Sequence, residues 1–254
     1  MGRAEHTERM AGAVDAVVAT MQSRQDQLTA EQEPLREFLG TYQRTTLAVG
    51  KAVDAGEFED SEWVERWDVA FAELYVVALD AHLSGGTPTR PWRLAFDAPP
   101  DLPALRHVLL GINAHVNYDL PQALLAVISD DDFADTSLMA SRRRDHERID
   151  GVLSSRVAAE DAELAVHGRS FTDRVLQPLN RISSKRFLRE SRMKVWHNTT
   201  ELQAARLAGA ASYDVRLGEL EVLSAARIAD LLAPGQVLLR LAVAGFGVTL
   251  PPAG

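Results

Sequence analysis

Cysteine is absent from this chain of 254 residues. Its absence excludes disulfide bonds, thiolate zinc sites and thiol nucleophiles, so any metal ion would need His, Asp, Glu or water as ligands. Long apolar runs are also missing, since no stretch approaches the roughly 18 consecutive apolar residues of a membrane-spanning helix. Residues 2–9 are polar and lack the apolar region of a secretory signal. We therefore expect a cytoplasmic protein without a membrane span.

Positive charge is in deficit, because 27 Lys and Arg residues stand against 36 Asp and Glu residues, for a net charge of -9. Non-specific binding to nucleic acids needs a basic surface that releases phosphate counterions. A small-molecule partner is therefore expected, and a nucleic-acid partner is not. Glycine-rich nucleotide loops, the nucleophile elbow and the His-Glu-x-x-His motif are also absent. Nucleotide binding, serine hydrolase chemistry and zincin protease chemistry consequently have no support.

Apolar residues recur at steps of three and four, which predicts amphipathic helices and an all-α, single-domain multi-helix bundle. The domain is expected to span residues 1–254, with a motif-bearing core at about 58–233 and N-terminal helices within 8–53 packed on it. Helices are predicted at about 8–28, 34–53, 61–83, 104–120, 137–166, 173–179, 184–208 and 218–232. Residues 237–250 fit either a helix or an extended segment.

Four polar or turn-rich stretches are expected to lack regular structure or to face solvent. Glycine and proline residues predict loops at 84–91 and 97–100, with Trp92 and Phe96 pinning the loop between them. The acidic run 130–132 is predicted to be a loop, and the arginine run 142–144 a solvated face.

The segment around His115 and Asp119 carries the best candidate site. At 100° per residue, Ile112, His115 and Asp119 lie within about 40° of Val108, so both titratable side chains share the apolar stripe of one helix. Burying such groups costs several kcal/mol unless they bind each other, a metal ion or a ligand. Because Pro121 limits or kinks the helix, the site is expected near a helix terminus.

A second pair with the same spacing, His146 and Asp150, also falls on an apolar helix face. Histidine and carboxylate side chains from facing helices form the metal sites of helical bundles, and these ligands suit zinc, iron or manganese. The pattern predicts one or two divalent metal ions held by His115, Asp119 and His146. Asp150 would be a further ligand or the base that activates a bound water.

Three functions are compatible with these residues. The first is a metal-assisted hydrolase of a small ester or phosphoester, with His115 and Asp150 as its catalytic residues. The second is a metal-free cyclase or isomerase of secondary metabolism, in which His115 and Asp119 act as acid and base. Its apolar substrate would be enclosed by Trp63, Trp67, Trp92 and Phe96. Substrate contacts in either enzyme are predicted for Trp92, Asn113 and Asn117. The third is a non-catalytic binding or structural protein, in which each His-Asp pair is a satisfied core contact.

The chain from about Phe58 to Ala233 resembles an uncharacterised, mainly actinobacterial family of unknown function. The likeness centres on the pattern Asn-Ala-His-x-Asn-x-Asp-Leu, which here comprises Asn113, Ala114, His115, Asn117, Asp119 and Leu120. The resemblance implies a helical fold and directs attention to this segment, but it implies no reaction.

A more distant likeness is to the zinc-dependent phospholipase C and single-strand nuclease superfamily. Its helical members bind metals through repeated His-x-x-x-Asp/Glu motifs, which His115 with Asp119 and His146 with Asp150 resemble. That superfamily has more histidines, a free N-terminal tryptophan and a histidine shortly after a proline, whereas Gln122 follows Pro121 here. The resemblance therefore implies one or two metal ions instead of three.

Overall fold

The computed structural model describes residues 2–166 and 193–233, and every regular element in these two ranges is a helix. This confirms the prediction of an all-α bundle. None of the helices in the same ranges has both the length and the apolar character that a membrane crossing requires. The elements are α1 (Gly2–Gln27), η1 (Ala30–Gln32), α2 (Glu33–Asp54), α3 (Ser61–Leu83), α4 (Arg90–Phe96), α5 (Ala104–Ala114), η2 (His115–Asp119), α6 (Leu120–Val127), α7 (Asp130–Ala134), α8 (Thr136–Val166), a helix over 193–208, and α10 (Ala210–Leu232).

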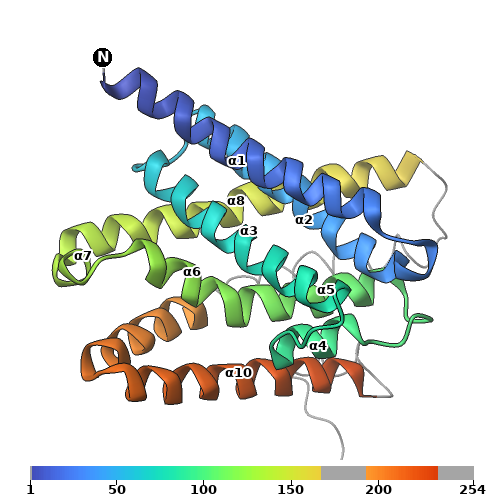
Figure 1. Cartoon of the computed structure of the whole chain (residues 1–254). Coiled ribbons are helices and arrows are strands. Elements are labelled where there is room, and N and C mark those ends of the chain that lie inside the picture. Colours follow the sequence, from blue (N-terminus) through green and yellow to red (C-terminus); the bar gives the residue numbers. More distant parts are fainter. Residues whose placement is uncertain (1, 167–192, 234–254) are drawn as a thin grey trace, which may run out of the picture.

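The continuous segment from α5 through η2 to α6 lies in the middle of the molecule. Figure 1 shows α1 with α2 and α3 above this segment and α10 along the lower edge. The segment packs against α2 and α3 on one side and against α10 on the other, while α4 joins α5 to α10. Side chains on η2 are therefore enclosed from both sides.

Helix α3 supplies much of the aromatic core. The side chain of Asp60 caps the helix by accepting a hydrogen bond of 2.9 Å from the backbone N–H of Trp63. Trp63, Trp67, Phe71 and Tyr75 follow at four-residue steps, and all four are buried. These rings belong to one hydrophobic cluster, whose buried residues extend from Val17 to Leu231. The single domain expected from the sequence stays a prediction.

Two segments predicted to be loops are short helices. Pro91 occupies the first turn of α4, where its fixed backbone angle favours a helix, and burial of Trp92 anchors that turn in the core. At the start of α7 the Ser129 hydroxyl accepts from the N–H of Asp132, whose carboxylate accepts in return from the N–H of Ser129. This capping box, and the favourable position of acidic groups at a helix N-terminus, make a helix of the run 130–132.

The prediction of a solvated arginine run at 142–144 was wrong for its first member. Arg142 is buried, pairs with Asp60, and lies over the Trp63 ring at 4.8 Å from its centroid. Cation–π contact and an ion pair together offset the cost of removing the guanidinium from water. Arg144 remains exposed and binds Glu59 at 2.8 Å. These contacts join α8 to the start of α3.

The remaining helix predictions are confirmed, shifted in their start, or outside the described residues. The helices expected at 8–28, 34–53, 61–83 and 137–166 are confirmed within a few residues, apart from the earlier start of α1. The helix expected at 218–232 begins eight residues sooner, at Ala210. Residues 173–179, 184–192 and 237–250 lie outside the described residues.

Candidate functional site

His115 and Asp119 lie on η2, a single π-turn between α5 and α6. In this turn the N–H of Leu120 bonds the carbonyl of His115, five residues back. Pro121 follows at once and has no N–H to donate to the carbonyl of Asn117, so the regular α-helical ladder is interrupted there. Such turns are rare and occur frequently at functional sites.

One carboxylate oxygen of Asp119 binds two partners. Its Oδ2 lies 2.7 Å from Nε1 of Trp92 and 2.9 Å from Nδ1 of His115. The indole N–H can only donate, so Oδ2 is an acceptor, and we assign the imidazole proton to Nδ1. The opposite nitrogen, Nε2, then carries a lone pair. It is buried and has no hydrogen-bond partner among the described residues.

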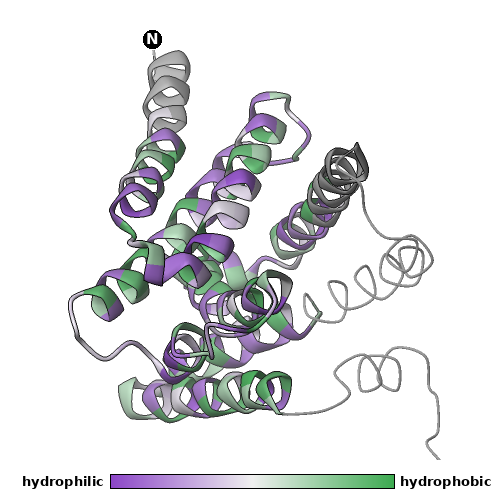
Figure 2. Ribbon diagram, turned by 90° about the vertical axis from the view of Figure 1, so that its right-hand side faces the viewer, coloured by the Kyte–Doolittle hydropathy of each residue, from purple (hydrophilic) through white to green (hydrophobic). Residues whose placement is uncertain are grey.

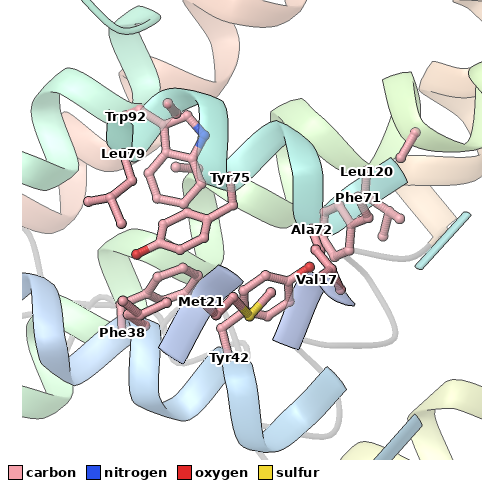
Figure 3. Packing of buried hydrophobic residues seen from close by; sticks show 14 of the residues in the cluster. Val17, Met21, Phe38, Tyr42, Phe71, Ala72, Tyr75, Leu79, Trp92 and Leu120 are labelled. Atoms are coloured by element: carbon pink, nitrogen blue, oxygen red, sulfur yellow. The ribbon is translucent and has the colours of Figure 1, made fainter. Parts of the chain in front are cut away.

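Aromatic rings surround the imidazole of His115, which is 2 % exposed. The ring of Phe71 stacks on it with centroids 3.5 Å apart, and Tyr42 meets it edge-on at 4.4 Å. Phe38, Tyr75 and Trp92 complete the enclosure at centroid distances of 6.1, 5.9 and 5.7 Å. Figure 3 shows these five rings converging from α2, α3 and α4. The histidine therefore sits in an apolar cage with one polar contact.

Burial sets the ionisation of the pair. It lowers the pKa of His115, and the nearby Asp119 opposes this only in part. Burial also raises the pKa of Asp119, while the hydrogen bonds from His115 and Trp92 favour its ionised form. Because the pKa of His115 is below its ordinary value, the imidazole is neutral at pH 7 and able to accept a proton at Nε2.

A third titratable group, Asp68, lies in the same region and was missed by the sequence analysis. It is buried on α3, and burial, followed by the charge of Glu65, raises its pKa to about 7. Its Oδ2 has no hydrogen-bond partner among the described residues. Burial raises the pKa of Tyr42, and the charge of Asp68 adds to that effect, so the phenol and the carboxyl interact. A helical wheel of α3 puts Asp68 on the same face as the buried Tyr75, and this was the sequence signal for its burial.

The second predicted pair is only partly described. His146 is buried on α8 between Trp67 and Trp196, with ring centroids 6.2 and 5.7 Å away. The side chain of Asp150 lies outside the described positions. Among the side chains that are described, no group of three or more His, Asp or Glu residues is arranged to hold a metal ion. His115, Asp119 and His146 are thus not gathered into a ready three-ligand set.

The predicted substrate contacts have different surroundings. Trp92 is buried at the site and holds Asp119 through its indole N–H. Asn113 donates to the carbonyl of Leu109 at 2.7 Å, and Asn117 donates to the side chain of Asn113 at 3.2 Å. These two amides therefore bond along their own helix.

A cavity of about 10 Å³ lies beside the cage. Phe38, Tyr75 and Trp92 line it, together with His107 and Gly111. The hydroxyl of Tyr75 and Nε2 of His107 are both buried without a partner among the described residues. A cavity of this size accommodates about one water molecule. The cavity thus shares three rings with the cage and suits a single water.

The fold and the site define an all-α protein with a buried, oriented His-Asp pair inside an aromatic cage. A family model described as a family of unknown function, DUF5995, matches residues 14–234, and the chain belongs to this family. No curated protein and no solved structure matches the chain. The actinobacterial range of the family and the likeness to zinc phospholipases and nucleases stay predictions.

Proposed function

We propose that the protein is an enzyme that performs acid-base catalysis on a small, largely apolar molecule. The observation that supports this most is the double contact at Asp119, whose Oδ2 accepts from both Trp92 and His115. A carboxylate that fixes one imidazole nitrogen as N–H leaves the other as a base of defined direction, which is how acid-base histidines are oriented in many enzymes. An isomerase or cyclase fits this pattern.

In this reaction His115 and Asp68 have opposite roles. Nε2 of neutral His115 removes a proton from the substrate, and the carboxylate of Asp119 stabilises the imidazolium that forms. Asp68, whose pKa is raised to about 7, holds a proton near neutral pH and donates it to another substrate atom. Groups whose surroundings shift their pKa values in opposite directions are suited to acid and base roles. The protein then returns to its starting state by transfer of one proton from His115 to Asp68.

Substrate entry requires movement of the cage. The cavity beside it holds about 10 Å³, whereas ligand pockets occupy some hundreds of Å³. Binding must therefore displace Phe38, Tyr75 or Trp92, and the cost of opening lowers the apparent affinity. Aromatic side chains that form the apolar core in the closed state would line the pocket in the open state.

The second candidate is a metal-assisted hydrolase of a small ester or phosphoester. It is favoured by the same contact, because a carboxylate behind a histidine is a frequent arrangement around protein-bound metals. A zinc, manganese or iron ion would bind Nε2 of His115. Asp119 would orient the imidazole through Nδ1, because Nδ1 and Nε2 lie on opposite sides of the ring and Asp119 does not face the metal. His146 and Asp150 remain the proposed further groups.

The test compares wild-type protein with His115→Gln, which fills similar space but lacks the imidazole. Both are assayed on enolisable ketones, esters and phosphoesters, and untagged protein purified without chelator is analysed for metals. The acid-base proposal expects metal-free turnover that is lost in His115→Gln. It also expects a bell-shaped rate profile that rises as His115 loses its proton and falls near pH 7 as Asp68 ionises.

Two results would contradict acid-base catalysis. Stoichiometric metal that His115→Gln loses, with ester or phosphoester turnover, would favour the hydrolase. A wild-type protein without turnover on any of these classes, in which His115→Gln only lowers stability, would favour a structural role for the pair.

A further inference from the structure

Helix α10 has a second apolar face that points away from the core. Its inner face buries Leu220, Ile228 and Leu231. On the outer side Val215, Val222 and Leu223 are 63, 50 and 62 % exposed. Among the described residues, these are three of the seven large hydrophobic side chains with high exposure. Helix α10 also lies along the lower edge of the molecule in both views, and Figure 2 colours several of its residues as hydrophobic.

The outer face is a continuous stripe. At 100° per residue, it is formed by positions within about 40° of Val222. Small residues predominate among them, and a Cβ added at Gly218 would meet nothing within 4 Å. A surface hollow is lined by Gly218, Glu219, Val222 and Leu223. Such a face has room for the side chains of a closely packed second helix. The stripe consists of Ala211, Val215, Gly218, Val222, Ala226 and Ala229.

Charged residues beside the stripe form a self-complementary pattern. Along the flank that contains Leu223, Arg216 and Glu219 precede this leucine by seven and four residues, and Arg227 and Asp230 follow it by four and seven. The signs therefore read plus, minus, leucine, plus, minus. Reversing the order about Leu223 places each positive charge opposite a negative one.

We propose that this face binds a second copy of the same chain, with the two α10 helices antiparallel. A two-fold axis between Val222 and Leu223 brings the same flank of both helices together. Arg216 then faces Asp230 of the second copy, and Glu219 faces Arg227 of the second copy. The stripe packs Val222 against its own equivalent and Gly218 against Ala226. In a parallel pair this flank would face the opposite flank, and the charge pattern would not be matched.

The symmetry of the contact limits the assembly to two chains. A two-fold contact uses the same patch on both copies and closes on itself, so it buries the exposed valines without leaving a free surface for further growth. The pairing is independent of the catalytic role proposed for His115, because α10 presents its outer face away from the cage.

The first experiment measures the mass of the full chain in solution by size-exclusion chromatography with light scattering. Wild-type protein at tens of micromolar is expected to have twice the mass of one chain. Val222→Glu is expected to have the mass of one chain. Val77→Glu, at a position 67 % exposed on α3, is the matched control and is expected to keep the doubled mass. A monomeric wild type, or a Val222→Glu variant that stays dimeric, would overturn the proposal.

Charge exchange tests the register. Glu219→Arg and Arg227→Glu alone each place like charges opposite one another, so either change is expected to weaken the dimer at least several-fold. The double variant restores opposite signs and is expected to regain most of the wild-type association. Single variants that associate as strongly as wild type, or a double variant that associates more weakly than either single variant, would contradict this register.

Cross-linking tests the relative direction of the two helices. Because the chain has no native cysteine, an introduced cysteine is the only thiol that can form a disulfide. Leu223→Cys lies near the proposed axis and is expected to form a disulfide-linked dimer on oxidation. Ala211→Cys lies twelve residues from Leu223, so its two copies would be about 36 Å apart and no self-cross-link is expected. Self-cross-linking of Ala211→Cys would indicate a parallel pair and overturn the antiparallel arrangement.

Discussion

Asp119 determines which nitrogen of His115 carries the proton. Both Trp92 and Nδ1 of His115 contact its Oδ2, so an Asn at this position keeps both hydrogen bonds by placing its single amide oxygen there. The imidazole then keeps its proton on Nδ1, but no negative charge is left to stabilise the imidazolium that forms when Nε2 accepts a proton. The chain around the site needs no rearrangement for this change, because Asn and Asp are nearly the same size.

The Asp119→Asn variant is expected to lose catalytic rate by a factor of up to about 10⁴, because the imidazolium loses its carboxylate partner. Its unfolding free energy should fall by about 1–3 kcal/mol, because a charge-assisted buried hydrogen bond is replaced. Steady-state kinetics and urea unfolding measure these two effects, and ¹⁵N NMR of the imidazole checks that the proton stays on Nδ1. A variant with wild-type activity would contradict the role assigned to Asp119.

Asp68 is expected to make stability depend on pH in an unusual direction. Its folded-state pKa is raised from 3.8 to about 7, so between these values the folded protein keeps a proton that the unfolded chain has lost. The contribution of this residue to stability therefore falls as the pH rises from about 4 to 7.

Asp68→Asn should remove that dependence. At pH 8 the variant is expected to be about 2–4 kcal/mol more stable than wild type, and near pH 4 the two should be alike. Urea unfolding at several pH values measures the difference. Glu73→Gln, at an exposed carboxylate on the same helix, is the matched control. A stability difference that does not change between pH 4 and 8 would show that Asp68 keeps the same charge when folded and unfolded.

At the scale of elements, the approach of α2 to α5 depends on one glycine. A Cβ on Gly111 would lie 2.3 Å from the ring of Phe38, which is also part of the cage. The absence of a side chain at this position therefore lets the aromatic ring reach the helix backbone one turn before His115.

Gly111→Ala is expected to destabilise the protein by roughly 1–3 kcal/mol through overpacking, and more if the helices separate. Gly151→Ala on α8 is the matched control, because its added Cβ meets nothing within 4 Å. That change should stabilise by about 0.5–1 kcal/mol, the usual gain for alanine over glycine in a helix. Thermal and urea unfolding compare the two. Equal effects of the same sign would mean that Phe38 yields to the added methyl group.

Elements differed in how well the sequence predicted them. The pattern in α3 was sufficient, because its cap and its apolar repeats lie within one segment. Helix α4 was not predicted, because its seven residues are held by burial of Trp92 in contacts distant in sequence. The contact of His115 with Asp119 could be foreseen from four-residue spacing. The burial of Asp68 was indicated only by its place beside Tyr75 on the helical wheel, because the packing of α2 and η2 against α3 decides it.

At the scale of the whole molecule, the proposed pairing through α10 links stability to concentration. A partner that binds only the folded state raises the apparent stability as its concentration increases. The midpoint of thermal unfolding is therefore expected to rise between about 1 and 100 µM for wild-type protein, and to stay constant for Val222→Glu. Differential scanning calorimetry at several concentrations measures this. A midpoint independent of concentration in wild type would contradict dimerisation.

Trp92 gives the protein a built-in optical reporter. Its indole N–H is bound to Asp119, its ring centroid lies 5.7 Å from that of the imidazole, and the same ring lines the small cavity. Any molecule that opens the cage must therefore change the polarity around this fluorophore. With Trp63 and Trp67 replaced by phenylalanine and Trp196 by tyrosine, the emission of one residue would follow the site alone. Compound collections could then be screened by the shift in its emission wavelength before any reaction is known.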